Sequence, residues 1–313
     1  MCPNLNDSQF IAVRSSQVHY YQNTPLYHNP GGKEFLLYKG QGDKLSPQRM
    51  LSSLYPPLFL HNRDRVTALQ EAQEIYTNKF LDGVKKKDQV YVKTIFAELV
   101  SDLFHEARIG AMKGMFTTAL ESIELLLHDY AGEIIHLANP VSKLDYGTAL
   151  HSVNVMAISL SFCHHLQLNE TTAREIALCG LLHDIGKAKI SNKILYADRR
   201  LSNSEFETIM LHPKDSQRIL AKGGLPITVQ KGALEHHEKL NGKGYPSKTQ
   251  NISLSGKIIG LIDCYEALTC DDRIYRRKLE SYDALSLIKK EMVNGSFDKT
   301  IYKEFICCLK SNT

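Results

Sequence analysis

The chain has 313 residues, 43% hydrophobic and 23% charged, which is typical of a globular protein with room for about two domains. A formal net charge of +4 is small for this length, so we expect no nucleic-acid polymer as partner, although a local basic pocket for an anionic ligand is compatible with it. The start lacks the features of a signal peptide, and no apolar run reaches the roughly 18 residues that a membrane span requires. We therefore expect a cytoplasmic protein without a membrane partner.

The first 66 residues differ from the rest of the chain in their local pattern. Short β-favouring runs occur at 17–21, 35–38 and 58–61, separated by turns rich in glycine and proline. Between the last two runs, residues 46–51 have the cap and first-turn proline of a short helix. Because this part contains no cluster of catalytic residue types, we predict a small α/β domain over residues 1–66 with a regulatory or sensory role.

Helical periodicity replaces the β pattern from about residue 65. Apolar residues recur at helical spacing through 66–82 and 90–127, and an exposed lysine run at 85–87 separates the two series. We expect residues 67–139 to form a helical connector, a role that also suits a dimerisation stalk.

The remainder of the chain is predicted to be all helical, with polar residues at helix ends and inside apolar faces. His183 and Asp184 close a helix that either Asn169 or Thr171 could cap, and burial of its apolar face would carry both into the interior. A buried, ionised carboxylate needs a partner or a metal ion. Each such residue alone has an ordinary explanation, as a capping or core residue. Together the candidates come from consecutive predicted helices: His151, His183, Asp184, His212, His236, His237 and Asp263.

Five imidazoles and two carboxylates exceed what one tetrahedral zinc ion needs and suit two octahedral metal ions about 3.5–4 Å apart. Mixed nitrogen and oxygen ligands favour iron or manganese, with zinc and nickel as further candidates. Lys187, Arg273 and Arg276 could form a cationic rim for a phosphate ester. A bridging hydroxide would then attack phosphorus, with Asp184 as the bridging carboxylate. No P-loop, Rossmann glycine pattern or nucleophilic triad is found in the sequence.

The order and spacing of six segments resemble the HD-GYP family of bacterial cyclic di-GMP phosphodiesterases, which belongs to the HD superfamily of metal-dependent phosphohydrolases. The segments are H-S-V-N-V at 151–155, L-L-H-D-I-G-K at 181–187, H-P at 212–213, H-H-E-K-L-N-G-K-G-Y-P at 236–246, D-C-Y-E-A-L-T at 263–269 and G-S-F-D at 295–298. The resemblance covers about residues 140 to 310 and assigns 140–313 to the HD-GYP domain. The N-terminal part also resembles the α/β domain that often precedes HD-GYP.

The resemblance implies a mainly α protein whose HD-GYP helical bundle carries a binuclear or trinuclear metal centre and hydrolyses cyclic di-GMP to pGpG and then GMP. Lys187, Arg273 and Arg276 would hold the phosphates, and Asp184 and Lys187 would act in catalysis. Tyr245 belongs to the loop that names the family, which is associated with contacts to diguanylate cyclase (GGDEF) domains. A homodimer is compatible with the resemblance. The implied metal ligands are His151, His183, Asp184, His212, His236, His237 and Asp263.

Several residues depart from the family pattern. Gly147 stands where members with three metal ions have a glutamate, which favours two ions here. Asn241 replaces the usual aspartate of the loop, and Glu266 replaces the second aspartate of D-x-x-D-A-L-T. The arginine segment has one extra residue at 271–272, and Ile274 replaces a proline. Two alternatives therefore stay open: a catalytically weak protein that binds cyclic di-GMP or a partner protein, and an HD hydrolase for another cyclic nucleotide.

Overall fold

The computed structural model describes residues 9–13, 17–31, 34–45, 55–109, 127–128, 130–135, 137, 147–270 and 278–311. Its described residues form two compact units, and the boundary between them lies at Asp82 and Gly83. This boundary falls inside the segment 67–139 that we expected to be a connector. None of the helices in the described ranges is both long and apolar enough to cross a membrane.

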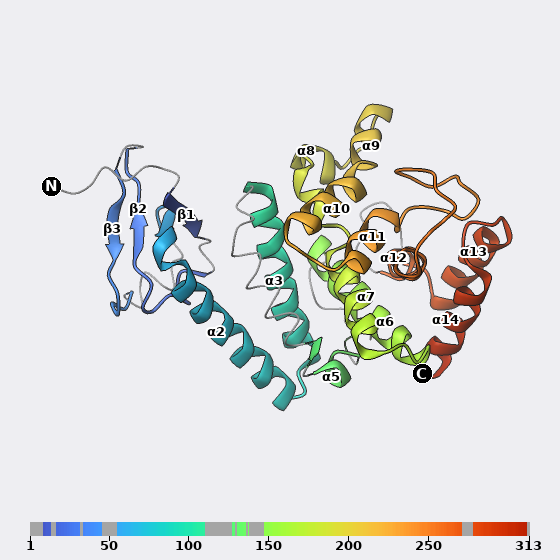
Figure 1. Cartoon of the computed structure of the whole chain (residues 1–313), viewed down its shortest axis with the longest axis horizontal. Helices are drawn as coiled ribbons and strands as arrows, with labels where there is room; N and C mark the ends of the chain where they lie inside the picture. The colour runs from blue at the N-terminus through green and yellow to red at the C-terminus, as the bar shows by residue number, and fades with distance from the viewer. Residues whose placement is uncertain are drawn as a thin grey trace. The chain divides into compact units, whose positions relative to one another are not determined.

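The first unit contains a small antiparallel sheet with the strand order β1-β4-β2-β3 (Figure 1). The register pairs Phe10 with His61 and Tyr27 with Phe59. The elements that follow the last strand are η3 (Asn62–Asp64) and α2 (Arg65–Lys85). The strands are β1 (Phe10–Val13), β2 (Leu26–His28), β3 (Leu36–Lys39) and β4 (Leu58–His61).

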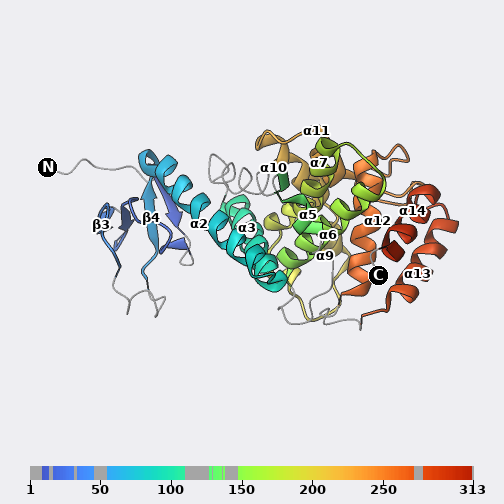
Figure 2. The same ribbon diagram turned by 90° about the horizontal axis from the view of Figure 1, so that it is seen from below.

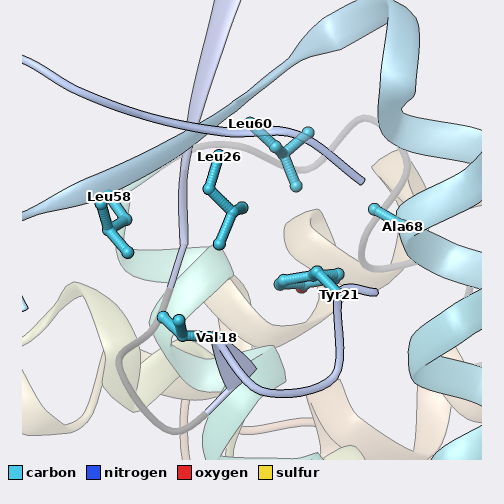
Figure 3. Packing of buried hydrophobic residues seen from close by; sticks show 6 residues of the cluster. All are labelled: Val18, Tyr21, Leu26, Leu58, Leu60 and Ala68. Atoms are coloured by element: carbon cyan, nitrogen blue, oxygen red, sulfur yellow. The ribbon is translucent and has the colours of Figure 1, made fainter. Parts of the chain in front are cut away.

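An apolar cluster packs the sheet of this unit against the start of α2 (Figure 3). Leu58 and Leu60 are buried on one face of β4 because alternate residues of a strand point the same way, and α2 contributes Ala68. The full cluster consists of Val18, Tyr21, Leu26, Leu58, Leu60 and Ala68.

The predicted strands agree with the structure only in part. The run at 58–61 is β4, and 35–38 overlaps β3. The strand predicted at 17–21 is wrong, because the N–H of Tyr20 donates to the carbonyl of Gln17 and closes a turn. Its apolar residues fill the core from that turn. The helix predicted at 46–51 lies outside the described residues.

The second unit is helical, which confirms the mainly α prediction (Figure 1). Helices α6 and α7 pack against each other, α11 and α12 cover α7, and α3 packs on α6 (Figure 2). The elements are α3 (Gln89–Ile109), α5 (Ala131–Ile135), α6 (Thr148–His165), α7 (Glu170–Leu182), η5 (Ile185–Lys189), α8 (Asn192–Leu195), α9 (Asn203–Ile209), α10 (His212–Lys222), α11 (Ile227–Glu235), α12 (Leu254–Thr269), α13 (Ser281–Val293) and α14 (Lys299–Ser311).

Local sequence accounts for the ends of these helices. The side chain of Asn169 accepts a hydrogen bond from the N–H of Thr172 and caps α7, as the sequence allowed. Ser202 and Glu205 form a reciprocal capping box at the start of α9. Pro213 lies in the first turn of α10, where its missing N–H has no helical partner to lose.

Candidate metal centre

The seven predicted metal ligands meet at one place in the helical unit. Their potential ligand atoms form three groups, and within each group the atoms lie within 4.8 Å of one another. The side chains of Asp263 and His237 are 14% and 25% exposed, whereas those of the other five are nearly inaccessible. The three groups are His212 with His236 and His237, His151 with His183 and Asp184, and His183 with His236 and Asp263.

Helix ends set the orientation of three of the imidazoles. His183 ends α7, His212 begins α10 and His236 ends α11. Each Nδ1 lies 2.7 or 2.8 Å from the carbonyl oxygen three residues earlier. A carbonyl can only accept, so Nδ1 carries the proton and Nε2 presents a lone pair to the centre. This is the tautomer that metal-binding histidines use.

Several hydrogen-bond acceptors at the centre lie close together without a donor between them in the part of the chain that the structure describes. Nε2 of His212 lies 3.3 Å from Nε2 of His236, although both atoms present lone pairs. His183 Nε2 and Asp184 Oδ1 are buried and have no hydrogen-bond partner among the described residues. Unpartnered buried acceptors are costly, and a cation between them would satisfy them together. The residues present therefore fit a metal centre.

Asp184 lies between the histidines. Its Oδ1 is 3.0 Å from Nε2 of His212, and its Oδ2 is 3.4 Å from Nε2 of His183. Lys187 also donates a hydrogen bond to Oδ2. Because the two carboxylate oxygens face different histidines, this side chain suits a bridging position between two ions.

The protonation states of the site follow from burial and local charge. Burial alone would raise the pKa of Asp184, but Lys187 and His183 hold it well below its usual range. Burial also opposes ionisation of Asp263, whose pKa is nevertheless lowered by His151. Burial and neighbouring imidazoles hold the pKa of His236 well below its usual value, and burial lowers that of His237 to about 3. Ionised carboxylates and neutral imidazoles are the states that bind metal ions.

His151 is set apart by a carboxylate at each of its two ring nitrogens, Asp263 at Nε2 and Glu266 at Nδ1. Burial acts to lower its pKa, but Glu266 and Asp263 together raise it to about 10. Nε2 of His151 lies 3.1 Å from Oδ1 of Asp263, and Nδ1 lies 2.5 Å from Oε2 of Glu266. A metal ion at Nε2 would take the place of the proton shared with Asp263.

Two glycines allow the segments that carry the ligands to approach. A Cβ at Gly186 would lie 2.1 Å from the carbonyl oxygen of His212, so only glycine lets η5 contact the start of α10. A Cβ at Gly260 would lie 2.4 Å from the carbonyl oxygen of His236, where α12 crosses the end of α11. Both contacts join segments that contribute candidate ligands.

Sequence reasoning missed the residues behind His151. We treated Glu266 only as a departure from the family, yet its buried carboxylate contacts His151, and Asn154 and Lys93 extend the contact. Helical spacing could have indicated two of them, since Glu266 is three residues after Asp263 and Asn154 three after His151. No sequence signal connects Lys93 to the site.

Of the four predicted substrate contacts, the structure describes Tyr245 and Lys187. The Tyr245 ring lies 4.7 Å from the ring of His237, and the N–H of Tyr245 donates to the carbonyl of His237 at 3.2 Å. Burial raises the pKa of Tyr245, so it stays a neutral phenol. Lys187 is 26% exposed beside Asp184. Arg273 and Arg276 lie outside the described residues.

Hydrogen bonds connect the loop from Asn241 to Pro246 with the segment after α13. The amide Nδ2 of Asn241 donates to the carbonyl of Asn294 and to Oγ of Ser296, both at 3.1 Å. An aspartate could not donate these two hydrogen bonds, so asparagine in place of the family's usual aspartate stabilises the loop here. Glu238 holds the far side of the loop by accepting a bond of 2.6 Å from the N–H of Ser247.

Comparison with known proteins adds a family assignment. A family model described as HD domain matches residues 131–301. Across 96% of this chain and 99% of the other, the fold is similar to that of Bd1817, described as an HDG"Y"P protein from Bdellovibrio bacteriovorus, with a TM-score of 0.59 and 16% identity. At that identity the likeness concerns the fold alone.

The sequence is also similar to proteins that are named phosphodiesterases. The chain is 29% identical over 215 residues to cyclic di-GMP phosphodiesterase PA4108 of Pseudomonas aeruginosa, which covers 66% of this chain and 50% of the relative. It is 32% identical to 3'3'-cGAMP-specific phosphodiesterase 1 of Vibrio cholerae, over 53% of this chain and 39% of the relative. The chain thus spans at most half the length of these two curated relatives.

Proposed function

The chain belongs to the HD domain family, and we propose that it is a metal-dependent phosphodiesterase that hydrolyses cyclic di-GMP to pGpG and GMP. The observation that carries the proposal is the convergence of imidazole Nε2 atoms and carboxylates on one buried point. Similarity to relatives named cyclic di-GMP phosphodiesterases supports the choice of substrate.

The proposed metal ligands are the residues that meet at the centre. Mixed nitrogen and oxygen donors favour iron or manganese over the alternatives zinc and nickel. Divalent ions bound there would supply polarisation of a phosphoryl oxygen and an activated water. We propose two ions rather than three, because Gly147 offers no side-chain ligand. The proposed ligands are His151, His183, Asp184, His212, His236, His237 and Asp263.

The protein's own residues would orient the substrate. Asp184 is proposed as the bridging carboxylate, since its two oxygens face different histidines. Lys187 lies beside it, is partly exposed and would donate to a phosphate oxygen. Tyr245 presents a neutral phenol next to His237 and would contact the substrate. We include Arg273 and Arg276 as phosphate contacts on the strength of the sequence.

A second substrate has support of its own. Relatives from Vibrio cholerae are named 3'3'-cGAMP-specific phosphodiesterases at about the same identity as the cyclic di-GMP enzymes. Both molecules are cyclic dinucleotides with two phosphodiester bonds, so the same metal chemistry would serve either. A protein that only binds such a nucleotide is the further alternative.

The proposed partners and domain roles extend the same interpretation. The loop from Asn241 to Pro246 is proposed as a contact for diguanylate cyclase domains, and the sheet unit as a sensory or regulatory domain. A homodimer and a cytoplasmic location stay predictions from the sequence.

Hydrolysis of a substrate panel tests the proposal. Purified chain would be loaded anaerobically with iron or manganese and incubated with cyclic di-GMP, 3'3'-cGAMP and pGpG. We expect pGpG and GMP from cyclic di-GMP, and none from the His183→Ala variant, which lacks a buried ligand. Faster turnover of 3'3'-cGAMP would favour the second substrate. Binding without product under either metal would contradict the enzymatic proposal.

A further inference from the structure

A line of hydrogen-bonded side chains connects α3 to His151. Nζ of Lys93 donates to Oδ1 of Asn154 at 2.8 Å, and Nδ2 of Asn154 donates to Oε1 of Glu266, also at 2.8 Å. The other oxygen of Glu266 contacts Nδ1 of His151 at 2.5 Å. The contacts cross three helices, α3, α6 and α12, of which α6 packs against the other two.

Burial makes this arrangement informative. Lys93 is 1% exposed and Glu266 is 4% exposed, so both charges are removed from water. Charged side chains are rarely buried unless other groups compensate them, so the partners of the buried Lys93 ammonium indicate what this residue does. The ammonium of Lys93 and the carboxylate of Glu266 lie on opposite sides of the Asn154 amide.

The donor and acceptor atoms of the Asn154 amide determine how this side chain is oriented between Lys93 and Glu266. Only Oδ1 of an asparagine can accept, and only Nδ2 can donate. The ammonium of Lys93 therefore holds Oδ1 on its side and turns Nδ2 toward Glu266. Glu266, held through one oxygen, presents the other to Nδ1 of His151 and so leaves Nε2 facing Asp184 and Asp263.

We propose that Lys93 is a positioning residue for the metal centre, which orients His151 through Asn154 and Glu266 and thereby strengthens metal binding. The inference rests on the proposed metal-dependent function. Partners behind a metal-binding histidine fix its ring and raise its basicity, and their loss commonly weakens metal affinity about 10- to 100-fold.

Metal affinity of the full chain tests this role directly. Apparent dissociation constants for Mn²⁺ would be measured by competition with a chromogenic chelator in wild type, Lys93→Met and Lys289→Met. The first change removes the donor to Asn154, and the second removes an equivalent charge from an exposed position on α13. We expect about 10-fold or greater weakening for Lys93→Met and no change for Lys289→Met.

A near-isosteric variant covers the case in which Lys93→Met does not fold. Asn154→Asp keeps an acceptor for Lys93 but loses the donor to Glu266 and places two carboxylates together. It should lower the thermal unfolding midpoint of the metal-free chain and also weaken Mn²⁺ binding by chain that circular dichroism shows to be folded at the assay temperature; wild-type affinity in the folded variant would overturn the inference.

A double-mutant cycle separates positioning from general loosening of the fold. If Lys93 acts through Glu266, adding Lys93→Met to Glu266→Gln should cost much less affinity than Lys93→Met alone. Independent, multiplicative losses would overturn the inference, as would wild-type affinity in Lys93→Met. A wild-type chain that binds no metal would contradict the proposed function as well, so the two failures are distinguishable.

Discussion

Substitution of Gly186 by alanine tests whether the close approach of η5 to α10 builds the centre. The new Cβ would lie 2.1 Å from the carbonyl oxygen of His212 and 2.5 Å from the backbone nitrogen of Ser216. Backbone atoms cannot turn aside as a side chain can, so η5 and α10 must separate. The separation would also stretch the hydrogen bond from the N–H of Gly186 to Oγ of Ser216, now 2.8 Å.

The magnitude follows from these two effects. Overpacking in a well-packed core costs about 1–3 kcal/mol, and loss of a buried hydrogen bond about 1 kcal/mol. Together they lower the free energy of unfolding by about 2–4 kcal/mol, which corresponds to a fall of about 4–16 °C in the unfolding midpoint of a unit of this size.

Thermal unfolding of the metal-free chain, followed by circular dichroism, measures the effect. Gly132→Ala is the matched control, because a Cβ at that helical glycine meets nothing within 4 Å and should leave stability unchanged or slightly raised. Gly186→Ala should also weaken Mn²⁺ binding, since it moves His212 away from Asp184. A wild-type midpoint for Gly186→Ala would refute the proposed packing.

Three further predictions concern stability. Asn169→Ala removes the cap of α7 and should cost about 1 kcal/mol in chemical denaturation, whereas Asn169→Ser should retain most of it; equal losses would contradict the capping role. Asn241→Asp removes the donors to Asn294 and Ser296 and should cost about 1–2 kcal/mol by the same assay, and no change would show that these bonds do not hold the loop. Mn²⁺ at 100 times its dissociation constant should add about 2.7 kcal/mol to the stability of the chain for each site that it fills, and a chelator should reverse the gain; an unchanged midpoint would argue against a site formed in the folded state.

The helical unit was predictable because its signals are local. Pro213 marked the start of α10, apolar periodicity marked α7 and α12, and polar residues at helix ends indicated a centre. His183, His212 and His236 lie at helix ends, whereas His151 and Asp263 lie within helices and were identified by the order and spacing of the motifs.

The parts that sequence reasoning missed depend on contacts between distant residues. The missed strands β1 and β2 both pair with β4, and such pairing between residues far apart in the sequence leaves no local signal. Lys93 and Asn154 are 61 positions apart and meet only because α3 packs on α6. In the sequence, Glu266 is only a departure from the aspartate of the family pattern. Its role becomes visible in the folded chain, where its carboxylate contacts His151.

The most direct test of the central claim is metal analysis of anaerobically purified protein coupled to a cyclic di-GMP hydrolysis assay, with Asp184→Asn as the variant. This substitution keeps the shape of the side chain but removes the charge between His183 and His212. We predict two metal ions per wild-type chain and release of pGpG, with metal and product both lost in the variant. Product from wild-type protein that carries no metal, or a metal-loaded protein that leaves every cyclic dinucleotide intact, would contradict the account.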